Sequence, residues 1–199
     1  MAMDVSVFLE PTVDMQRLEQ ILDGLGHEGR VHATRSWDFK RQSAIYEAAK
    51  GRTLDLDFMV PPSVGVGVEV IHDLHNTLPV FYNAQKRFCR LPDGEKYKVG
   101  GYNHQTMAAV TGPGYFVVRE GEGDAAGEII VDYTELPKNK VESWPKVVPH
   151  GGLIGGIVWG NMMDYMRRVS AHVSIGRAHR GNPRKPTNDY FTLVRKDVA

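Results

Sequence analysis

Residues 69–79, EVIHDLHNTLP, carry two histidines three positions apart. Whether the two side chains can act together depends on whether this segment forms a helix or a strand. On a helix, His72 and His75 would share one face and could hold a metal ion. Apolar and polar residues alternate through this stretch, however, which predicts a half-buried strand. The strand places His72 on the apolar face with Val70 and Leu74, and it places His75 on the polar face, where we expect solvent. The two histidines therefore do not form a chelating pair.

The chain before this strand shows helical periodicity. Residues 11–26, PTVDMQRLEQILDGLG, space their apolar residues at i, i+3, i+4 and i+7, with Thr12 as the expected N-cap. Residues 36–51, SWDFKRQSAIYEAAKG, predict a second helix. Residues 53–60, TLDLDFMV, then alternate and predict a half-buried strand. The predicted N-terminal helical segment therefore covers residues 12–51.

Strand signals dominate the rest of the chain. Residues 80–90, VFYNAQKRFCR, fit either a strand or a short helix. Residues 161–169 predict a late helix, because their apolar side chains fall on one helical face. Further segments contain the alternation and the flanking turn residues of strands: 94–105, 112–120, 127–136, 172–180 and 188–196.

Successive strands joined by hairpin-type turns predict an antiparallel sheet. About seven or eight short strands tend to curl into a barrel or a strongly bent sheet. The sequence therefore predicts an α+β fold, in which a curved antiparallel β-sheet or β-barrel carries two N-terminal helices and one late helix. No linker-like stretch divides the chain, so we expect residues 1–199 to form a single domain. An eight-stranded barrel is about wide enough to hold one small ligand.

The charge balance argues against two classes of partner. Lys+Arg and Asp+Glu both total 24, so the formal net charge is zero. This removes the usual electrostatic basis for binding nucleic acid or an anionic membrane, and we expect neither as a partner. No apolar run has the length of a transmembrane helix, and the N-terminal residues lack the features of a signal peptide. Cys89 is the only cysteine, which suits a reducing cytoplasmic location.

Metal and cofactor signatures are missing from the sequence. The eight histidines are scattered, and none has the spacing of a zinc finger or of an HExxH motif. The glycine-rich stretches at 65–70 and 111–116 lack the spacing or the following helix of a nucleotide-binding loop. We therefore predict no metal and no cofactor, although a site built from three distant histidines stays open.

Candidate site residues come from strand parity and from mixtures of aromatic and polar side chains. In a barrel, the apolar face that carries His72 points toward the interior, where a histidine can act as a general acid or base. The alternative is a core histidine that hydrogen bonds satisfy. His104 is a second acid/base candidate, since GYNHQTM at 101–107 follows a glycine pair, and a simple turn is its alternative. The expected ligand-binding residues are Tyr102, Tyr133, Trp159 and Tyr165.

The C-terminal residues 162–197 are similar to the end of the GXWXG-type bacterial proteins of unknown function. The segment KRF at 86–88 also resembles part of that family's WYGKRF, whereas the GXWXG motif itself is absent from this chain. The resemblance implies a lipocalin-like β-barrel and assigns no catalytic residue. The residues that carry it are Asp164, Arg167, Arg168, Val169, Gly176, Tyr190, Phe191, Leu193, Arg195 and Lys196.

Three functions fit these observations. The first is a binding protein that holds a small apolar or aromatic molecule in the barrel cavity. The second is a cofactor-independent enzyme, such as a lyase, isomerase or cyclase, that uses His72 or His104 as general acid/base. The third is a protein-interaction module that pairs through an exposed sheet edge. The sequence leaves open both a homodimer and the question of whether a reaction is catalysed.

Overall fold

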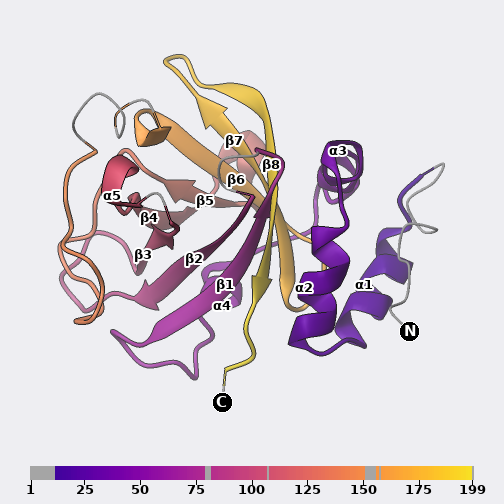
Figure 1. Cartoon of the computed structure of the whole chain (residues 1–199), viewed down its shortest axis with the longest axis horizontal. Helices are drawn as coiled ribbons and strands as arrows, with labels where there is room; N and C mark the ends of the chain where they lie inside the picture. Colours follow the sequence, from indigo (N-terminus) through magenta and orange to yellow (C-terminus); the bar gives the residue numbers. More distant parts are fainter. Residues whose placement is uncertain (1–11, 79–81, 107, 151–155, 157, 199) are drawn as a thin grey trace.

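The computed structural model describes residues 12–78, 82–106, 108–150, 156 and 158–198. Their central feature is a closed antiparallel barrel of eight strands, each paired with its neighbours in sequence order (Figure 1). This confirms the predicted α+β fold in its barrel form. The strands are β1 Glu69–Asn76, β2 Asn83–Arg90, β3 Val99–His104, β4 Tyr115–Glu120, β5 Ile129–Asp132, β6 Met162–Arg168, β7 Val173–Arg180 and β8 Lys185–Arg195.

Closure of the barrel depends on the pairing of its first and last strands. β1 pairs with β8 from His72 opposite Arg195 to Asn76 opposite Phe191. Successive strand residues point to opposite faces, so one face of every strand turns inward and the other outward. The inward set forms a core that includes Val70, Phe88 and Met166.

Three helices lie beside the barrel, and the second and third of them pack on its outer face against β1, β7 and β8 (Figure 1). They are α1 Met15–Asp23, α2 His27–Arg35 and α3 Phe39–Ala48. Their apolar side chains form a second buried cluster with outward residues of the barrel, among them Ile175 and Val194. The two predicted helices are present, and α2 is an additional helix that the sequence pattern did not indicate.

The caps of the helices differ from the prediction. The Asp14 carboxylate accepts a hydrogen bond from the Arg17 amide at 2.9 Å and caps α1, so Thr12 is not the N-cap. A cap aspartate also explains why the predicted strand at 53–60 is wrong, since none of these residues lies in a strand. Asp55 accepts from the Phe58 amide at 2.8 Å and starts the short helix α4, Leu56–Met59. An N-terminal cap supplies partners for helix amides and competes with strand pairing.

The predicted late helix at 161–169 is also wrong, because this segment forms β6. Strand β6 pairs with β5 from Met166 opposite Ile129 to Met163 opposite Asp132, and with β7 on its other side. The ladder bonds on both sides outweigh the helical spacing of the apolar residues. Two further short helical elements are α5, Ala108–Thr111, and a 3-10 turn at Gly123–Ala125.

His75 is buried instead of solvated. Its side chain lies under the N-terminal helices, where the Nε2 atom is 3.3 Å from the Trp37 carbonyl oxygen and Nδ1 is 3.4 Å from the Asn83 side-chain oxygen. The expectation failed because the outer face of β1 is covered by helices rather than by water. The neighbouring Asp73 on this face accepts a hydrogen bond from His27 at 2.8 Å.

The two ends of the barrel differ. Helix α4 lies at the end where β1 begins and where β2 and β8 finish. Arginines of β2 and β8 bind its backbone there. The Arg90 guanidinium donates to the Val60 carbonyl at 2.7 Å, and Arg195 donates to the Phe58 carbonyl at 2.5 Å. The opposite end, where β1 finishes and β2 begins, carries the cavity described next.

Candidate functional site

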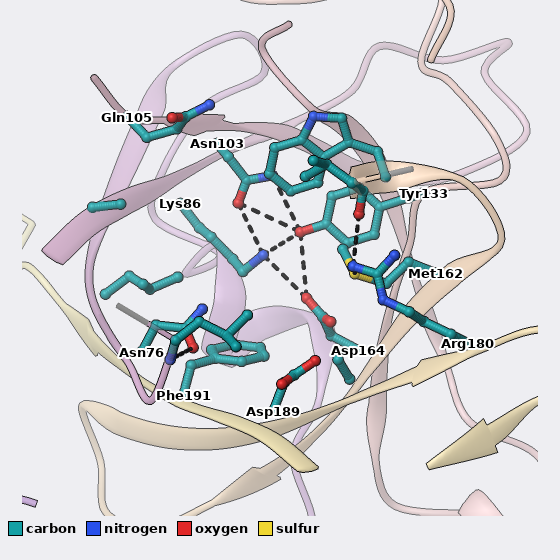
Figure 2. A pocket seen from close by; sticks show the side chains of 16 residues that line it. Asn76, Lys86, Asn103, Gln105, Tyr133, Met162, Asp164, Arg180, Asp189 and Phe191 are labelled. Carbon is teal, nitrogen blue, oxygen red and sulfur yellow. Dashed lines mark hydrogen bonds and ion pairs between the residues drawn. The ribbon is translucent and has the colours of Figure 1, made fainter. Parts of the chain in front are cut away.

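A cavity of about 60 Å³ lies inside the barrel at the end opposite α4. Its wall combines apolar and polar side chains from several strands (Figure 2). Four of them form a buried polar cluster, which we call the Lys86 cluster and which consists of Lys86, Asn103, Tyr133 and Asp164. Each of the four is at most 5 % exposed, so the cluster is shielded from bulk water.

The strands bring these four residues together from distant parts of the chain. Lys86 on β2 lies directly opposite Asn103 on β3. Asp164 is an inward residue of β6, and Tyr133 directly follows β5. All four side chains converge on the same point inside the barrel (Figure 2).

The lysine amine is the centre of the hydrogen-bond network. Lys86 Nζ donates to Asn103 Oδ1 at 3.0 Å and to Asp164 Oδ2 at 3.1 Å, and it also contacts the Tyr133 hydroxyl. The Asn103 amide donates to the Gly114 carbonyl at 2.8 Å and to Tyr133 Oη at 3.1 Å. Tyr133 Oη lies 3.3 Å from Asp164 Oδ2 and can donate its proton to this carboxylate. The polar atoms of the cluster are thus tied to one another and to the backbone.

Burial controls the protonation of the cluster. It lowers the pKa of Lys86, and the Asp164 carboxylate acts in the opposite direction by favouring the ammonium. Burial also raises the pKa of Tyr133 well above its ordinary value, and Asp164 adds to this effect. Tyr133 is therefore a neutral phenol at physiological pH and keeps its proton available for donation.

Aromatic rings surround the lysine amine. Nζ lies 5.3 Å from the ring centre of Phe116, 5.0 Å from that of Tyr133 and 5.1 Å from that of Phe191. These distances are within the range of cation–π attraction. The rings lower the local polarity and also favour a positive charge at this point.

Trp159 completes the aromatic wall. Its ring stacks on Tyr133, with the ring centres 5.4 Å apart and an angle of 15° between the planes. The indole nitrogen donates to the Thr111 carbonyl at 2.8 Å, which fixes the ring. Gly114 makes room for the ring, because a Cβ at this position would lie 2.7 Å from the indole. Its positive φ of 57° also favours glycine.

The structure brings two of the six candidate residues from the sequence into this cavity. Tyr133 and Trp159 both line it. Tyr102 and His104 flank Asn103 on β3, and they point to the outer face because Asn103 points inward. Tyr165 is likewise an outward residue of β6 and packs on His179, with ring centres 4.3 Å apart.

Tyr102 and His104 lie together outside the barrel. Their side chains are joined by a contact of 3.3 Å between the Tyr102 hydroxyl and His104 Nδ1. Tyr102 also packs against Trp144, with ring centres 4.9 Å apart. Tyr102 is thus part of the packing beneath the segment that carries Trp144, whereas His104 is exposed.

His72 points into the barrel as predicted, but it lies near α4 and not among the side chains that line the cavity. Its Nε2 atom is 2.9 Å from the Met59 carbonyl oxygen, and its ring is 4.6 Å from that of Phe88. Complete burial lowers the pKa of His72 to about 3, although the bond to Met59 works against this shift. The ring is therefore neutral at physiological pH.

Three residues of the Lys86 cluster were not among the sequence candidates. Lys86 lies in the 80–90 segment, where strand and helix were both possible, so its direction was undetermined. Asp164 lies in the segment predicted as a helix, where helical spacing selected Tyr165 instead. Asn103 lies between Tyr102 and His104 in GYNHQTM, and these two neighbours were chosen in its place.

No family model, characterised protein or solved structure matches the chain. The resemblance of the C-terminal residues to the GXWXG-type proteins therefore stays a prediction. Within the described parts of the chain, no group of three or more His, Cys, Asp or Glu side chains could hold a metal ion. No helix in those same parts is long and apolar enough to cross a membrane.

Proposed function

We propose that the protein binds a small molecule with an aromatic or apolar part and a polar group, inside the cavity opposite α4. The observation that carries this proposal is the Lys86 cluster, a set of convergent polar groups in a cavity whose remaining wall is largely apolar and aromatic. Ligand sites characteristically combine such walls with a few placed polar groups. The lysine and Tyr133 would bind the polar group of the ligand, and Trp159 and Phe191 would contact its apolar part.

The size of the cavity supports a small ligand. One buried water needs about 10–15 Å³, so a cavity of about 60 Å³ takes only a few water-sized groups. A single ring, or the end of a longer molecule, suits this space. The proposal therefore narrows the expected ligand to a small aromatic compound or to one with a small aromatic head.

The two alternatives from the sequence fit the structure less well. A protein that pairs through a sheet edge needs unpaired strands, whereas every barrel strand is paired on both sides. The enzyme alternative assigned acid/base roles to His72 and His104, and neither lines the cavity. Their catalytic roles, a cytoplasmic location and a homodimer stay predictions.

Benzyl alcohol is a suitable first probe, because it joins one aromatic ring to one hydrogen-bonding group. We expect titration with benzyl alcohol to change the tryptophan fluorescence through Trp159 and to give a matching heat signal in calorimetry. The indole of Trp144 lies outside the barrel, so the change in fluorescence should persist in the Trp144→Phe variant. It should disappear in the Trp159→Phe variant. The Ala178→Phe substitution, which fills the cavity wall, should weaken binding. Binding that both Trp159→Phe and Ala178→Phe leave unchanged would contradict the proposal.

A further inference from the structure

The Lys86 cluster contains more chemistry than binding alone requires. Exchange of a buried ion pair for apolar side chains of similar size is often neutral or stabilising, so the pair is weak evidence of a role in stability. Lys86 instead places a primary amine at the wall of a cavity, with a carboxylate and a phenol within hydrogen-bond reach. An amine that is held between a proton acceptor and a proton donor is equipped for covalent chemistry.

We propose that Lys86 forms a Schiff base with the carbonyl group of an aldehyde or ketone bound in this cavity. The inference rests on the proposed binding function and specifies the class of its ligand. Cys89, the single thiol of the chain, packs instead in the cluster of Tyr102 and Trp144 outside the barrel. Lys86 is therefore the nucleophile that a ligand in the cavity meets.

The first step is the addition of the amine to the carbonyl group. The Lys86 ammonium passes one proton to Asp164 Oδ2, which is 3.1 Å away. The nitrogen lone pair then forms the new C–N bond, and the carbonyl π electrons move to oxygen. The oxygen takes a proton from the Tyr133 hydroxyl, and Tyr133 recovers a proton from the nitrogen. The product is a neutral carbinolamine beside a protonated Asp164.

The second step is the loss of water. The proton on Asp164 moves to the carbinolamine hydroxyl, the C–O bond breaks, and water leaves with its electron pair. The nitrogen lone pair closes the C=N bond and gives a protonated imine. The overall change converts an ammonium and a carbonyl into an iminium and one water, so the charge is conserved. The carboxylate of Asp164 again faces one positive charge.

The surroundings of Lys86 favour both the reaction and its product. Burial lowers the pKa of the amine, which increases the fraction of the nucleophilic form. The rings of Phe116, Tyr133 and Phe191 lie about the nitrogen and would stabilise the cationic imine. The low exposure of the cluster limits the water that would hydrolyse it.

The test compares benzaldehyde with benzyl alcohol, which has nearly the same shape and no carbonyl group. The whole protein is incubated with benzaldehyde and sodium cyanoborohydride near neutral pH, and peptide mass mapping then locates the benzylated lysines. We expect Lys86 to react at least about tenfold faster than exposed lysines, whose amines are mostly protonated at this pH. Excess benzyl alcohol should protect Lys86 by occupying the cavity.

Two variants examine the chemistry. Lys96 is 68 % exposed and lies outside the cavity, so Lys96→Met should leave the labelling of Lys86 unchanged. Tyr133→Phe keeps the ring and removes the proton donor. We expect it to slow the labelling of Lys86 by at least about tenfold, while circular dichroism confirms that the variant is folded.

The outcomes separate the two proposals. Selective labelling of Lys86 that benzyl alcohol prevents would support the Schiff base. Binding of benzyl alcohol with Lys86 labelled no faster than Lys96 would overturn the Schiff base and leave the binding function in place. Loss of both binding and selective labelling would overturn both.

Discussion

The substitution Asp164→Asn removes the negative charge beside Lys86 and keeps the size of the side chain. Over the distance of 3.1 Å, the attraction between two unit charges at an effective dielectric constant of about 20 is about 5 kcal/mol. The variant can avoid a buried unpaired ammonium by releasing the lysine proton. At pH 7 this release costs about 4.6 kcal/mol for an unfolded-state lysine pKa of about 10.4. We therefore expect a loss of about 3–5 kcal/mol in the free energy of unfolding.

The loss should depend on pH in a defined direction. In the folded variant Lys86 is neutral, whereas in the unfolded chain it binds a proton below pH of about 10.4. The unfolded state then binds more protons, so the stability of the variant rises with pH. Asp164 favours the ammonium in the wild type, which makes this dependence weaker there. The difference between the two proteins should narrow by up to about 1.4 kcal/mol per pH unit toward alkaline pH.

Urea unfolding followed by circular dichroism measures both effects. A double-mutant cycle with Lys86→Met isolates the pairwise energy, and the double variant should recover much of the stability that Asp164→Asn loses. The exposed pair of Lys96 and Glu135 provides a matched control, and Glu135→Gln should leave the unfolding midpoint almost unchanged. A loss below about 1 kcal/mol that does not change with pH would refute the assignment of a buried ion pair.

Three further substitutions test other parts of the structure by urea unfolding. His72 has a pKa of about 3 in the folded protein, so the unfolded chain binds more protons than the folded one between about pH 6.5 and pH 3. The free energy of unfolding should therefore fall as the pH decreases through this range. The His72→Gln variant should lose this contribution, which is up to about 1.4 kcal/mol per pH unit. Asp55→Ala removes the cap of α4 and should cost about 1 kcal/mol. Gly101→Ala should lower the free energy of unfolding by about 1–3 kcal/mol, because the added Cβ would lie 2.2 Å from the Arg87 carbonyl oxygen. Gly65→Ala is the control and should lower it less, because the Cβ there meets only one atom, at 3.8 Å.

The barrel could be predicted from the sequence because strand alternation is a local property. The segment with His72 shows this best, since Val70, His72 and Leu74 all point inward as the alternation indicated. The same rule failed for His75, because the alternation identifies two faces of a strand but not what covers the outer one. Here the N-terminal helices take the place of solvent, and their position depends on contacts with β8 and β7 that are distant in sequence.

Local spacing was ambiguous in the segment that became β6. Met162 and Met166 are four positions apart, which satisfies both a helical face and one face of a strand. The helical interpretation grouped them with Tyr165, whereas the strand groups them with Asp164. The ladders to β5 and β7 decide between the two, and neither partner is visible within the segment itself. The helical interpretation therefore selected Tyr165, which lies on the outer face, in place of Asp164, which lines the cavity.

The remaining part of the site follows from the strand register. A slip of one residue in β2 would turn Lys86 outward and would separate it from Asn103. The register that closes the barrel therefore also builds the Lys86 cluster. Lys86 lies between Ala84 and Phe88 on the inward face, where the binary pattern calls for an apolar side chain. These two neighbours follow the apolar pattern, and a residue that breaks such a pattern is a candidate for function. Lys86 is such a residue, because it places a charged amine on the inward face.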